Sequence, residues 1–293
     1  MFNYSICGFS VHSQIQIPIL SEKIKSVNCD IKFLLNDQSN LFSNSLKKEE
    51  LSFYNNSLIY KDKNGVVFKF DNTKNDQCVI INIYPNECDY AHIWESIINI
   101  PIGYALSSKS VNVVHGSSVA IKDSAACIFG FSGQGKSTLA LSLVDKGFKF
   151  ITEDLCIFKD ENIYQFHSWI KTSKEIIEKY KIQIEDKILL ANDSRERNLY
   201  KLSKKNCSEK SIPKIAYFLA EGEDRSINKI SKTESFTFLL TNFYRFENEK
   251  KSDLNKMTEM LKSLDFYLYT RNINDSIEEN SKFLSNHILS ILS

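Results

Sequence analysis

The sequence has few glycines and prolines, no excess of either charge and no long apolar stretch. Its 293 residues include only 9 Gly and 4 Pro, which excludes collagen and long Pro/Gly-rich linkers. The 37 basic and 36 acidic residues leave a net charge of +1, so we expect no nucleic-acid partner. No apolar run reaches the roughly 18 residues of a membrane helix, and the N-terminus lacks a secretory pattern. We therefore expect a soluble, cytoplasmic protein without a membrane partner.

Paired cysteines and N-terminal arginines are also missing. The 7 cysteines are scattered without a Cys-x-x-Cys pair, which is typical of reduced, mostly buried thiols and argues against a disulfide framework or a zinc site. All arginines lie in the C-terminal half of the chain, at Arg195, Arg197, Arg225, Arg245 and Arg271.

The length suggests about two domains at roughly 150 residues each. Residues 1–88 predict a β-rich region, because short apolar or alternating runs such as 78–84 are separated by turn signals. Asn64-Gly65 between the runs 57–60 and 66–70 predicts a hairpin, and the polar stretch 36–50 predicts an exposed loop. We expect this region to bind a substrate or a partner.

Residues 89–293 predict an α/β domain. A helical spacing over 89–106, kinked at Pro101, is followed by strand patterns over 111–121 and 125–129. A turn, a helix over 136–146 ended by Gly147 and a further strand complete a β-turn-α-β unit, whose right-handed crossover makes its two strands parallel. Beyond it, we expect a strand over 214–219, helices over 234–244, 253–264 and 276–292, and a strand over 266–269.

The turn carries a phosphate-binding motif. Residues 130–137, Gly-Phe-Ser-Gly-Gln-Gly-Lys-Ser, fit the pattern G-x-x-x-x-G-K-[ST] between an apolar strand and an amphipathic helix. Glycines let backbone N–H groups form a concave nest for phosphate oxygens, and the helix adds the positive end of its dipole. Lys136 can reach the β- and γ-phosphates, and the Ser137 hydroxyl can bind Mg²⁺. The predicted nucleotide-binding residues are Gly130, Ser132, Gly133, Gln134, Gly135, Lys136, Ser137 and Thr138.

Two acidic residues, Glu153 and Asp154, follow the next strand. The carboxyl ends of strands in open α/β sheets border the ligand crevice, so these acids are expected beside the phosphates. One carboxylate would hold Mg²⁺ and the other would accept the proton of an attacking hydroxyl, whereas the alternative is a solvated acidic turn. His115, in a His-Gly segment, is by itself more often a structural histidine, as we take His12, His92, His167 and His287 to be.

Taken together, three segments resemble the catalytic domain of the HPr serine kinase/phosphorylase superfamily. They are His115 to Val119, the loop from Gly130 to Ala140, and Gly147 with Ile151-Thr152-Glu153-Asp154. More loosely, the whole chain resembles the HPr-kinase-like proteins encoded with lasso-peptide and related peptide-modification genes. The resemblance implies a P-loop kinase domain of the HPr kinase type, with a mixed sheet and flanking helices behind the β-rich N-terminal region.

The resemblance also implies roles for single residues. Ser137 and Asp154 would bind magnesium, Lys136 would hold the phosphates of ATP, Glu153 would stand where the family has its catalytic aspartate, and His115 would lie near the transferred phosphate. Glu153 is one methylene longer than that aspartate, and the glycine- and arginine-rich segment that follows the double aspartate in HPr kinases is missing, which argues against HPr as the substrate. A homo-oligomer fits the resemblance, because HPr kinases are oligomers.

The sequence therefore predicts an ATP- and Mg²⁺-dependent kinase whose acceptor is a hydroxyl, expected to be a serine of a peptide or small protein. An arginine that stabilises the transition state must be one of the five named above, unless a neighbouring subunit supplies it. A lysine could replace it as a point charge, and the candidates are Lys171, Lys201 and Lys204. The stretch from Lys201 to Lys205 also fits a solvated charged run. Two alternatives stay open: a small-molecule kinase that uses the same loop, and a non-catalytic nucleotide-binding regulator.

Overall fold

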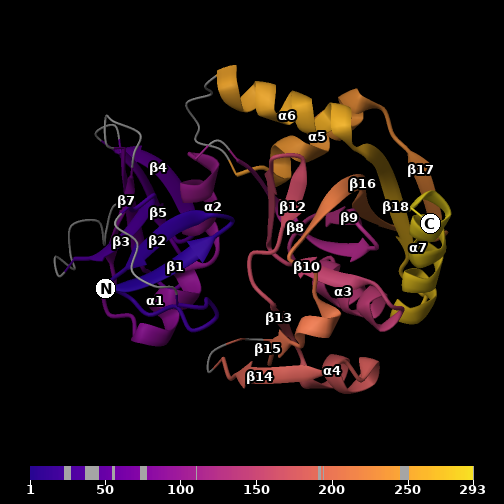
Figure 1. Ribbon diagram of the computed structural model, residues 1–293, viewed down its shortest axis with the longest axis horizontal. Helices are drawn as coiled ribbons and strands as arrows, with labels where there is room; N and C mark the ends of the chain where they lie inside the picture. Colours follow the sequence, from indigo (N-terminus) through magenta and orange to yellow (C-terminus); the bar gives the residue numbers. More distant parts are fainter. Residues whose placement is uncertain are drawn as a thin grey trace. The chain divides into compact units, whose positions relative to one another are not determined.

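The structure, a computed structural model, divides the chain into two compact units, and each is described by itself (Figure 1). The first unit comprises residues 1–110 and 244–248, and the second comprises residues 111–243 and 249–293. The structure describes residues 1–22, 28–36, 46–54, 57–72, 78–109, 111–190, 193, 195–244 and 251–292. Among them, no helix combines the length and the apolar character needed to cross a bilayer.

The first unit is built on a mixed sheet in the order β1-β2-β3-β7-β6-β5-β4. β2, β3 and β7 are parallel neighbours, and the other pairs are antiparallel. Residues alternate between buried and half-buried positions along β7, as expected for a strand with one face on a core. The strands are β1 (Phe2–Ile6), β2 (Phe9–Ser13), β3 (Ile31–Leu35), β4 (Glu50–Tyr54), β5 (Ser57–Lys61), β6 (Val67–Asn72) and β7 (Val79–Tyr84).

The hairpin predicted at Asn64-Gly65 is confirmed, because β5 and β6 are antiparallel neighbours. Gly65 has a φ of 103°, which favours glycine, and the Asp62 carboxylate accepts the N–H groups of Asn64, Gly65 and Val66. The predicted loop at 36–50 falls largely on residues 37–45, outside the described residues, and Glu50 already begins β4.

The prediction of one kinked helix over 89–106 is wrong. This stretch forms two separate helices, α1 (Tyr90–Ile97) and α2 (Ile100–Ser107). Pro101 lies in the first turn of α2, where its missing N–H costs nothing and its fixed φ suits a helix start. Both helices belong to the first unit: Ser96 donates to Asp62, and the ring of Tyr104 packs edge-on against Phe70. The division therefore comes at residue 110 and not at the expected residue 88.

The second unit is mixed α/β, as predicted. Its main sheet runs in the order β10-β8-β11-β12-β16-β18-β17, and β9 pairs with both β8 and β16. β16 has parallel neighbours in β9 and β18, and an antiparallel three-stranded arrangement β13-β15-β14 lies apart from this sheet. The strands are β8 (Asn112–Ile121), β9 (Ser124–Phe129), β10 (Lys149–Thr152), β11 (Leu155–Lys159), β12 (Asn162–Tyr164), β13 (Trp169–Thr172), β14 (Ile184–Ile188), β15 (Asn198–Leu202), β16 (Lys210–Gly222), β17 (Ser226–Lys229) and β18 (Asp265–Asn272).

Helices cover both faces of the main sheet. Along β9 and β16, alternate side chains enter two separate cores: Ile128 and Tyr217 pack with α3 (Lys136–Asp145) and α7 (Ile277–Leu292), whereas Phe129 and Phe218 pack with α5 (Lys232–Asn242) and α6 (Lys251–Ser263). The short helix α4 (Lys174–Tyr180) contributes Tyr180 to the first core. The predicted late helices and the strands at 214–219 and 266–269 are confirmed.

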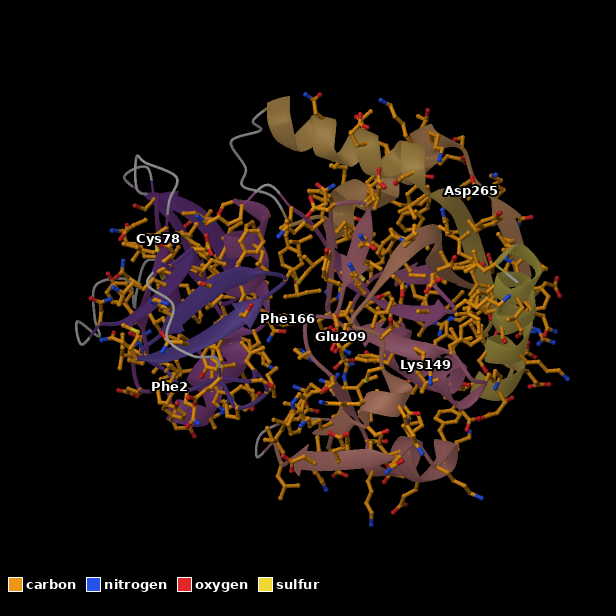
Figure 2. All side chains as sticks on the ribbon, viewed as in Figure 1. Phe2, Cys78, Lys149, Phe166, Glu209 and Asp265 are labelled. Atoms are coloured by element: carbon orange, nitrogen blue, oxygen red, sulfur yellow. The ribbon has the colours of Figure 1, made fainter. Side chains whose placement is uncertain are left out.

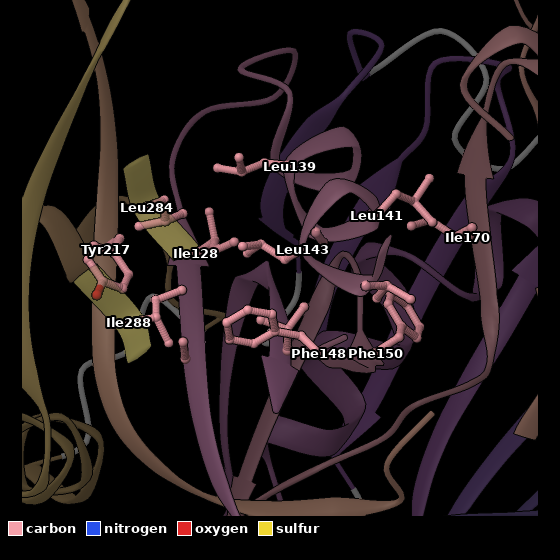
Figure 3. Close-up of a cluster of buried hydrophobic side chains, with 14 of the residues drawn as sticks. Ile128, Leu139, Leu141, Leu143, Phe148, Phe150, Ile170, Tyr217, Leu284 and Ile288 are labelled. Atoms are coloured by element: carbon pink, nitrogen blue, oxygen red, sulfur yellow. The ribbon is translucent and has the colours of Figure 1, made fainter. Parts of the chain in front are cut away.

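The first core fixes the helix that follows the glycine-rich turn (Figure 3). Leu139 and Leu143 of α3 pack in one cluster with Leu284 and Ile288 of α7. A buried hydrogen bond of 2.6 Å, from the Ser142 hydroxyl to the Ser281 hydroxyl, joins the same two helices. Because α3 is held on the sheet in this way, the position of its N-terminus is fixed by packing and not by the loop alone.

The β-turn-α-β unit has the predicted orientation. β9 and β10 pair with the same stretch of β8, one on each edge and both antiparallel to it, so they run parallel to each other with β8 between them. β10 and β11 follow one another along β8, with Thr152 opposite Ser118 and Leu155 opposite His115. Glu153 and Asp154 interrupt this long edge, directly beside the end of the His115 segment.

Candidate active site

The glycine-rich loop has the backbone that its sequence predicts. Gly130, Gly133 and Gly135 have positive φ angles of 148°, 88° and 71°, which side chains disfavour. A Cβ on Gly130 would also clash with Oε1 of Gln134, which accepts the Phe131 N–H at 2.7 Å. The first turn of α3 leaves its N–H groups without acceptors inside the helix, so they point to the space above the loop, where an anion would be stabilised.

Lys136 folds back over this loop. Its side chain is only 7% exposed, and its Nζ donates to the carbonyl oxygens of Gly130, at 2.8 Å, and Phe131, at 2.9 Å. Burial lowers the pKa of Lys136 below its usual value, and the nearby Asp154 and Glu153 carboxylates act in the opposite direction. The ammonium group is thus bonded to the loop carbonyls and lies within electrostatic range of the acidic pair.

Glu153 and Asp154 leave the sheet edge through a tight turn. The N–H of Leu155 donates to the Glu153 carbonyl at 2.7 Å, and Asp154 has a positive φ of 61°. Glu153 is buried, at 2% exposure, and Asp154 is half-buried. The turn therefore places two consecutive carboxylates at the same sheet edge, and the Glu153 carboxylate is much less accessible to water than that of Asp154.

Glu153 is the most perturbed acid of the site. One carboxylate oxygen accepts the backbone N–H of Lys171, and the other has no hydrogen-bond partner within the described residues. Burial, and then the charge of Asp154, raise the pKa of Glu153 to about 8, although the nearby Ser137 hydroxyl and the Lys171 amide act in the opposite direction. A carboxyl group with such a pKa can exchange a proton near neutral pH.

This burial has a measurable consequence for stability. The pKa of Glu153 is about 8 in the folded protein, compared with an ordinary value of 4.5. The neutral side chain therefore contributes its full share of the folding stability below pH 4.5, and this contribution is lost as the pH rises through about 8. At about 1.4 kcal/mol per pKa unit, the loss amounts to a few kcal/mol. We expect Glu153→Gln to remove this pH dependence and to unfold at a higher temperature than the wild type at pH 9, in the absence of nucleotide.

Thermal denaturation at pH 6 and pH 9 measures the effect. Glu209→Gln is the matched control, because Glu209 is exposed and should leave the pH dependence of the wild type unchanged. An equal loss of stability between the two pH values in Glu153→Gln and in the wild type would show that Glu153 is ionised in the folded protein throughout this range.

Two histidines lie close to Asp154. Nδ1 of His115 is 3.1 Å from the Asp154 carbonyl oxygen, which can only accept, so Nδ1 carries the proton in this contact. Burial lowers the pKa of His115, and Asp154 acts in the opposite direction. His167, which the sequence placed among the structural histidines, is buried too; burial lowers its pKa to about 4 against the opposing charge of Asp154. Burial therefore favours the neutral imidazole in both residues.

A cationic cluster borders the acidic pair, and Asp193 is its centre. Asp193 accepts from Nη2 of Arg197 at 2.8 Å and from Nζ of Lys171 at 3.0 Å, and its side chain is only 3% exposed. Burial alone would raise the pKa of Asp193, but the hydrogen bonds from Arg197 and Lys171 hold it below its usual value. The hydrogen bond to Asp193, and after it the charges of Asp154 and Glu153, raise the pKa of Arg197. Asp193 therefore fixes two cations beside the acids.

Two further arginines border the loop. A Cβ placed on Gly133 would lie 3.7 Å from Nη2 of Arg195, and one on Gly135 would lie 3.2 Å from Nη1 of Arg271. Of the predicted arginine candidates, the structure thus brings Arg195, Arg197 and Arg271 to the site. Arg225 pairs instead with Asp275, at 2.7 Å, and Arg245 lies outside the described residues.

The lysine candidates separate in the same way. Lys171 joins the acidic pair through its backbone N–H, as described above. Lys201 of β15 pairs with Glu185 of β14 at 3.5 Å. The backbone N–H of Lys204, which begins the short 3-10 helix after β15, donates to the same glutamate, so both lysines are engaged away from the site. Figure 2 shows the side chains of this part of the second unit.

Among the residues that sequence reasoning named, the loop residues from Gly130 to Thr138, Glu153, Asp154 and His115 come together. Ser132 is exposed on the loop, and Thr138 faces a neighbouring cavity. Asp193 was missed, although the charged segment Asp193-Ser194-Arg195-Glu196-Arg197 is a local signal for such a cluster.

The donor atoms fit magnesium better than a softer metal. In the described part of the chain, no three side chains of His, Cys, Asp or Glu cluster as a metal site. The Ser137 hydroxyl and the two carboxylates supply oxygen atoms, one of them the unpartnered Glu153 oxygen. Mg²⁺ is typically bound by one or two such protein oxygens together with phosphate oxygens and water.

No model of a known protein family matches the sequence, and no curated protein matches it. Among solved structures, the chain is similar to the Hpr(Ser) kinase/phosphatase from Coxiella burnetii, with 11% sequence identity and a TM-score of 0.35. The similarity covers 61% of this chain and 92% of that one. A likeness of this size carries no argument about activity, so the function must be inferred from the site itself.

Proposed function

We propose that the protein is an ATP- and Mg²⁺-dependent kinase that transfers the γ-phosphate to a hydroxyl group, that of a serine in a peptide or small protein. The observation that carries the proposal is the position of Lys136 and the α3 N-terminus next to the carboxylates of Glu153 and Asp154. A phosphate-binding loop beside a proton acceptor is the minimum that phosphoryl transfer to an alcohol requires.

The loop would bind the triphosphate. The inward-facing N–H groups of the loop and of the first turn of α3 would bind the phosphate oxygens, and Lys136 would exchange its two loop carbonyls for the β- and γ-phosphates. Ser137 and Asp154 would hold Mg²⁺, which when bound neutralises phosphate charge.

Glu153 would act on the acceptor. As the acceptor oxygen forms its bond to the γ-phosphorus and the bond to the β,γ-bridging oxygen breaks, the acceptor proton passes to the Glu153 carboxylate, and ADP leaves. A base with a pKa of about 8 is well matched to this role near neutral pH. The Lys171 amide fixes one oxygen of the carboxylate and leaves the other available.

The arginines would stabilise the charge that spreads over the transferred group. Arg195 lies against Gly133 of the loop, and Arg197 lies beside the acidic pair, where Asp193 keeps its planar guanidinium oriented. Preoriented cations of this kind lower the barrier without reorganising during the reaction. A second subunit is therefore not required to supply an arginine.

Incubation with γ-labelled ATP and Mg²⁺ tests the proposal. The acceptors offered are peptides encoded beside the gene and a panel of small hydroxyl compounds, and mass spectrometry locates the label. We expect a phosphoserine in one of the peptides. A labelled metabolite and unlabelled peptides would favour the small-molecule kinase, and ATP binding without any transfer would favour the non-catalytic regulator.

A further inference from the structure

Two cysteines of the first unit lie next to each other, although 49 positions separate them in the sequence. The Cys78 thiol donates to the sulfur of Cys29, and the two Sγ atoms are 3.6 Å apart. Both side chains are half-buried, and no disulfide joins them. Figure 2 labels Cys78. The residues of the candidate active site all belong to the second unit, so this pair of thiols is a separate feature of the chain.

Two neighbouring strands in the middle of the sheet bring the cysteines together. β3 and β7 are parallel, with Ile31 opposite Val79, and the Val79 N–H donates to the Asp30 carbonyl at 2.8 Å. The same register places Cys78 opposite Asp30, one position away from Cys29. With about 4.8 Å between strands and about 3.3 Å per residue, this offset puts the two Cα atoms roughly 6 Å apart, a distance that a disulfide spans.

The chain around Cys29 is also tied to β2. The Asp30 carboxylate accepts the Ser10 N–H at 2.7 Å, and the Asp30 N–H donates to the Ser10 carbonyl at 2.9 Å. The Cys29 thiol itself donates to the Ile31 carbonyl at 3.2 Å. These bonds hold the Cys29 sulfur beside Cys78, so only a small movement separates the present contact from the S–S bonding distance of about 2 Å.

The surroundings of the pair make its oxidation slow but not impossible. Burial, and then the hydrogen bond from Cys78, raise the pKa of Cys29 to about 12. The Cys29 thiolate, the form that attacks a disulfide, is therefore rare near neutral pH. Because both side chains are only half-buried, a small reagent can still reach them. Once the reagent has bonded to one sulfur, the neighbouring thiol is in place to displace it.

We propose that Cys29 and Cys78 form a redox-sensitive site, at which a low-molecular-weight disulfide closes a reversible cross-link between β3 and β7. A thiolate of the pair attacks one sulfur of the small disulfide; this step forms a mixed disulfide and releases a first small thiol. The other cysteine then attacks the protein sulfur of the mixed disulfide, forms the Cys29–Cys78 bond and releases a second small thiol. The protein loses two electrons and two protons, and the small disulfide gains them. This inference does not depend on the proposed function.

The cross-link changes the stability of the first unit. It joins positions 49 apart, so it removes much of the conformational freedom of the unfolded chain. Its two ends lie on neighbouring strands in the middle of the sheet, so the sheet cannot separate between β3 and β7 while the bond is closed. The oxidised protein therefore unfolds at a higher temperature than the reduced protein.

Treatment of the reduced full-length protein with an excess of oxidised glutathione tests the site. Peptide mapping by mass spectrometry should find a cross-link between Cys29 and Cys78, and a reducing agent should release it. The midpoint of thermal denaturation should rise by about 5–10 °C on oxidation and return on reduction. Cys78→Ser should show neither change. Cys88→Ser removes another half-buried cysteine of the same unit and, as the matched control, should respond like the wild type.

The mapping is made on the wild type, so it does not depend on the folding of a variant. Unreacted thiols at both positions, glutathione retained on Cys29 or Cys78 without a cross-link, or equal cross-linking of other cysteines would overturn the inference. A cross-link that leaves the midpoint unchanged or lowers it would do the same, because the fold would then have to distort to accept the bond. None of these results bears on the proposed kinase.

Discussion

Replacing Lys136 with alanine is expected to lower kcat/KM for phosphoryl transfer by about a hundredfold to a thousandfold, the cost of removing one preoriented group that stabilises developing charge. The side chain is buried and its Nζ already lies over the loop, bonded to Gly130 and Phe131. A triphosphate would draw the ammonium group only a short way. The initial rate of transfer from γ-labelled ATP to the labelled acceptor measures the effect.

Lys214→Ala is the control for Lys136→Ala. Lys214 is an exposed lysine on β16 of the same unit, so its removal changes the net charge equally without touching the loop. It should react at the rate of the wild type. Full labelling by Lys136→Ala would show that the loop does not hold the transferred phosphate in the way proposed.

Glu153→Gln is expected to lower turnover by about a hundredfold to ten-thousandfold, because an amide cannot accept the acceptor proton. The affinity for ATP should change much less, since the loop N–H groups and Lys136 are untouched. Single-turnover rates and a separate ATP titration distinguish the two effects. Glutamine keeps the length of the side chain and its acceptor for the Lys171 N–H, so the surrounding structure should be preserved.

The variant Glu153→Asp provides a second test of the role of Glu153. The shorter side chain keeps the carboxylate but moves it by about 1 Å, a misplacement that can cost about a hundredfold in rate. Its turnover should fall between those of the wild type and Glu153→Gln. If Glu153→Gln turned over at the wild-type rate, the proton acceptor would be another group, with Asp154 as the first candidate.

The substitution Glu153→Gln is thus expected to have opposite effects on the rate of transfer and on the stability of the protein. Glu153→Gln should lower turnover and at the same time stabilise the nucleotide-free protein above pH 8, because the buried carboxyl group is costly to ionise. A buried acid with a raised pKa beside a phosphate-binding motif is a candidate functional residue, and its burial lowers the stability of the protein at high pH.

The phosphate loop could be predicted in detail because its information is contiguous. Three glycines, a lysine and a serine within residues 130–137, between a strand and a helix, determine both the positive φ angles and the facing N–H groups. The hairpin at Asn64-Gly65 was predictable for the same reason. The boundary between the units was not predictable, because it depends on contacts of Ser96 with Asp62 and of Tyr104 with Phe70, which lie much earlier in the chain.

What the sequence by itself determined is the pair of elements that form the candidate site: the glycine-rich loop with Lys136, and two consecutive acids after the next strand. Only the tertiary structure decided their properties. β8 brings His115 to the Asp154 carbonyl across 39 residues, packing buries Glu153 and so raises its pKa, and Asp193 gathers Lys171 and Arg197 beside it. The burial of a side chain and its distance from other charges depend on which distant segments of the chain pack together. The order of residues along the chain does not specify that packing.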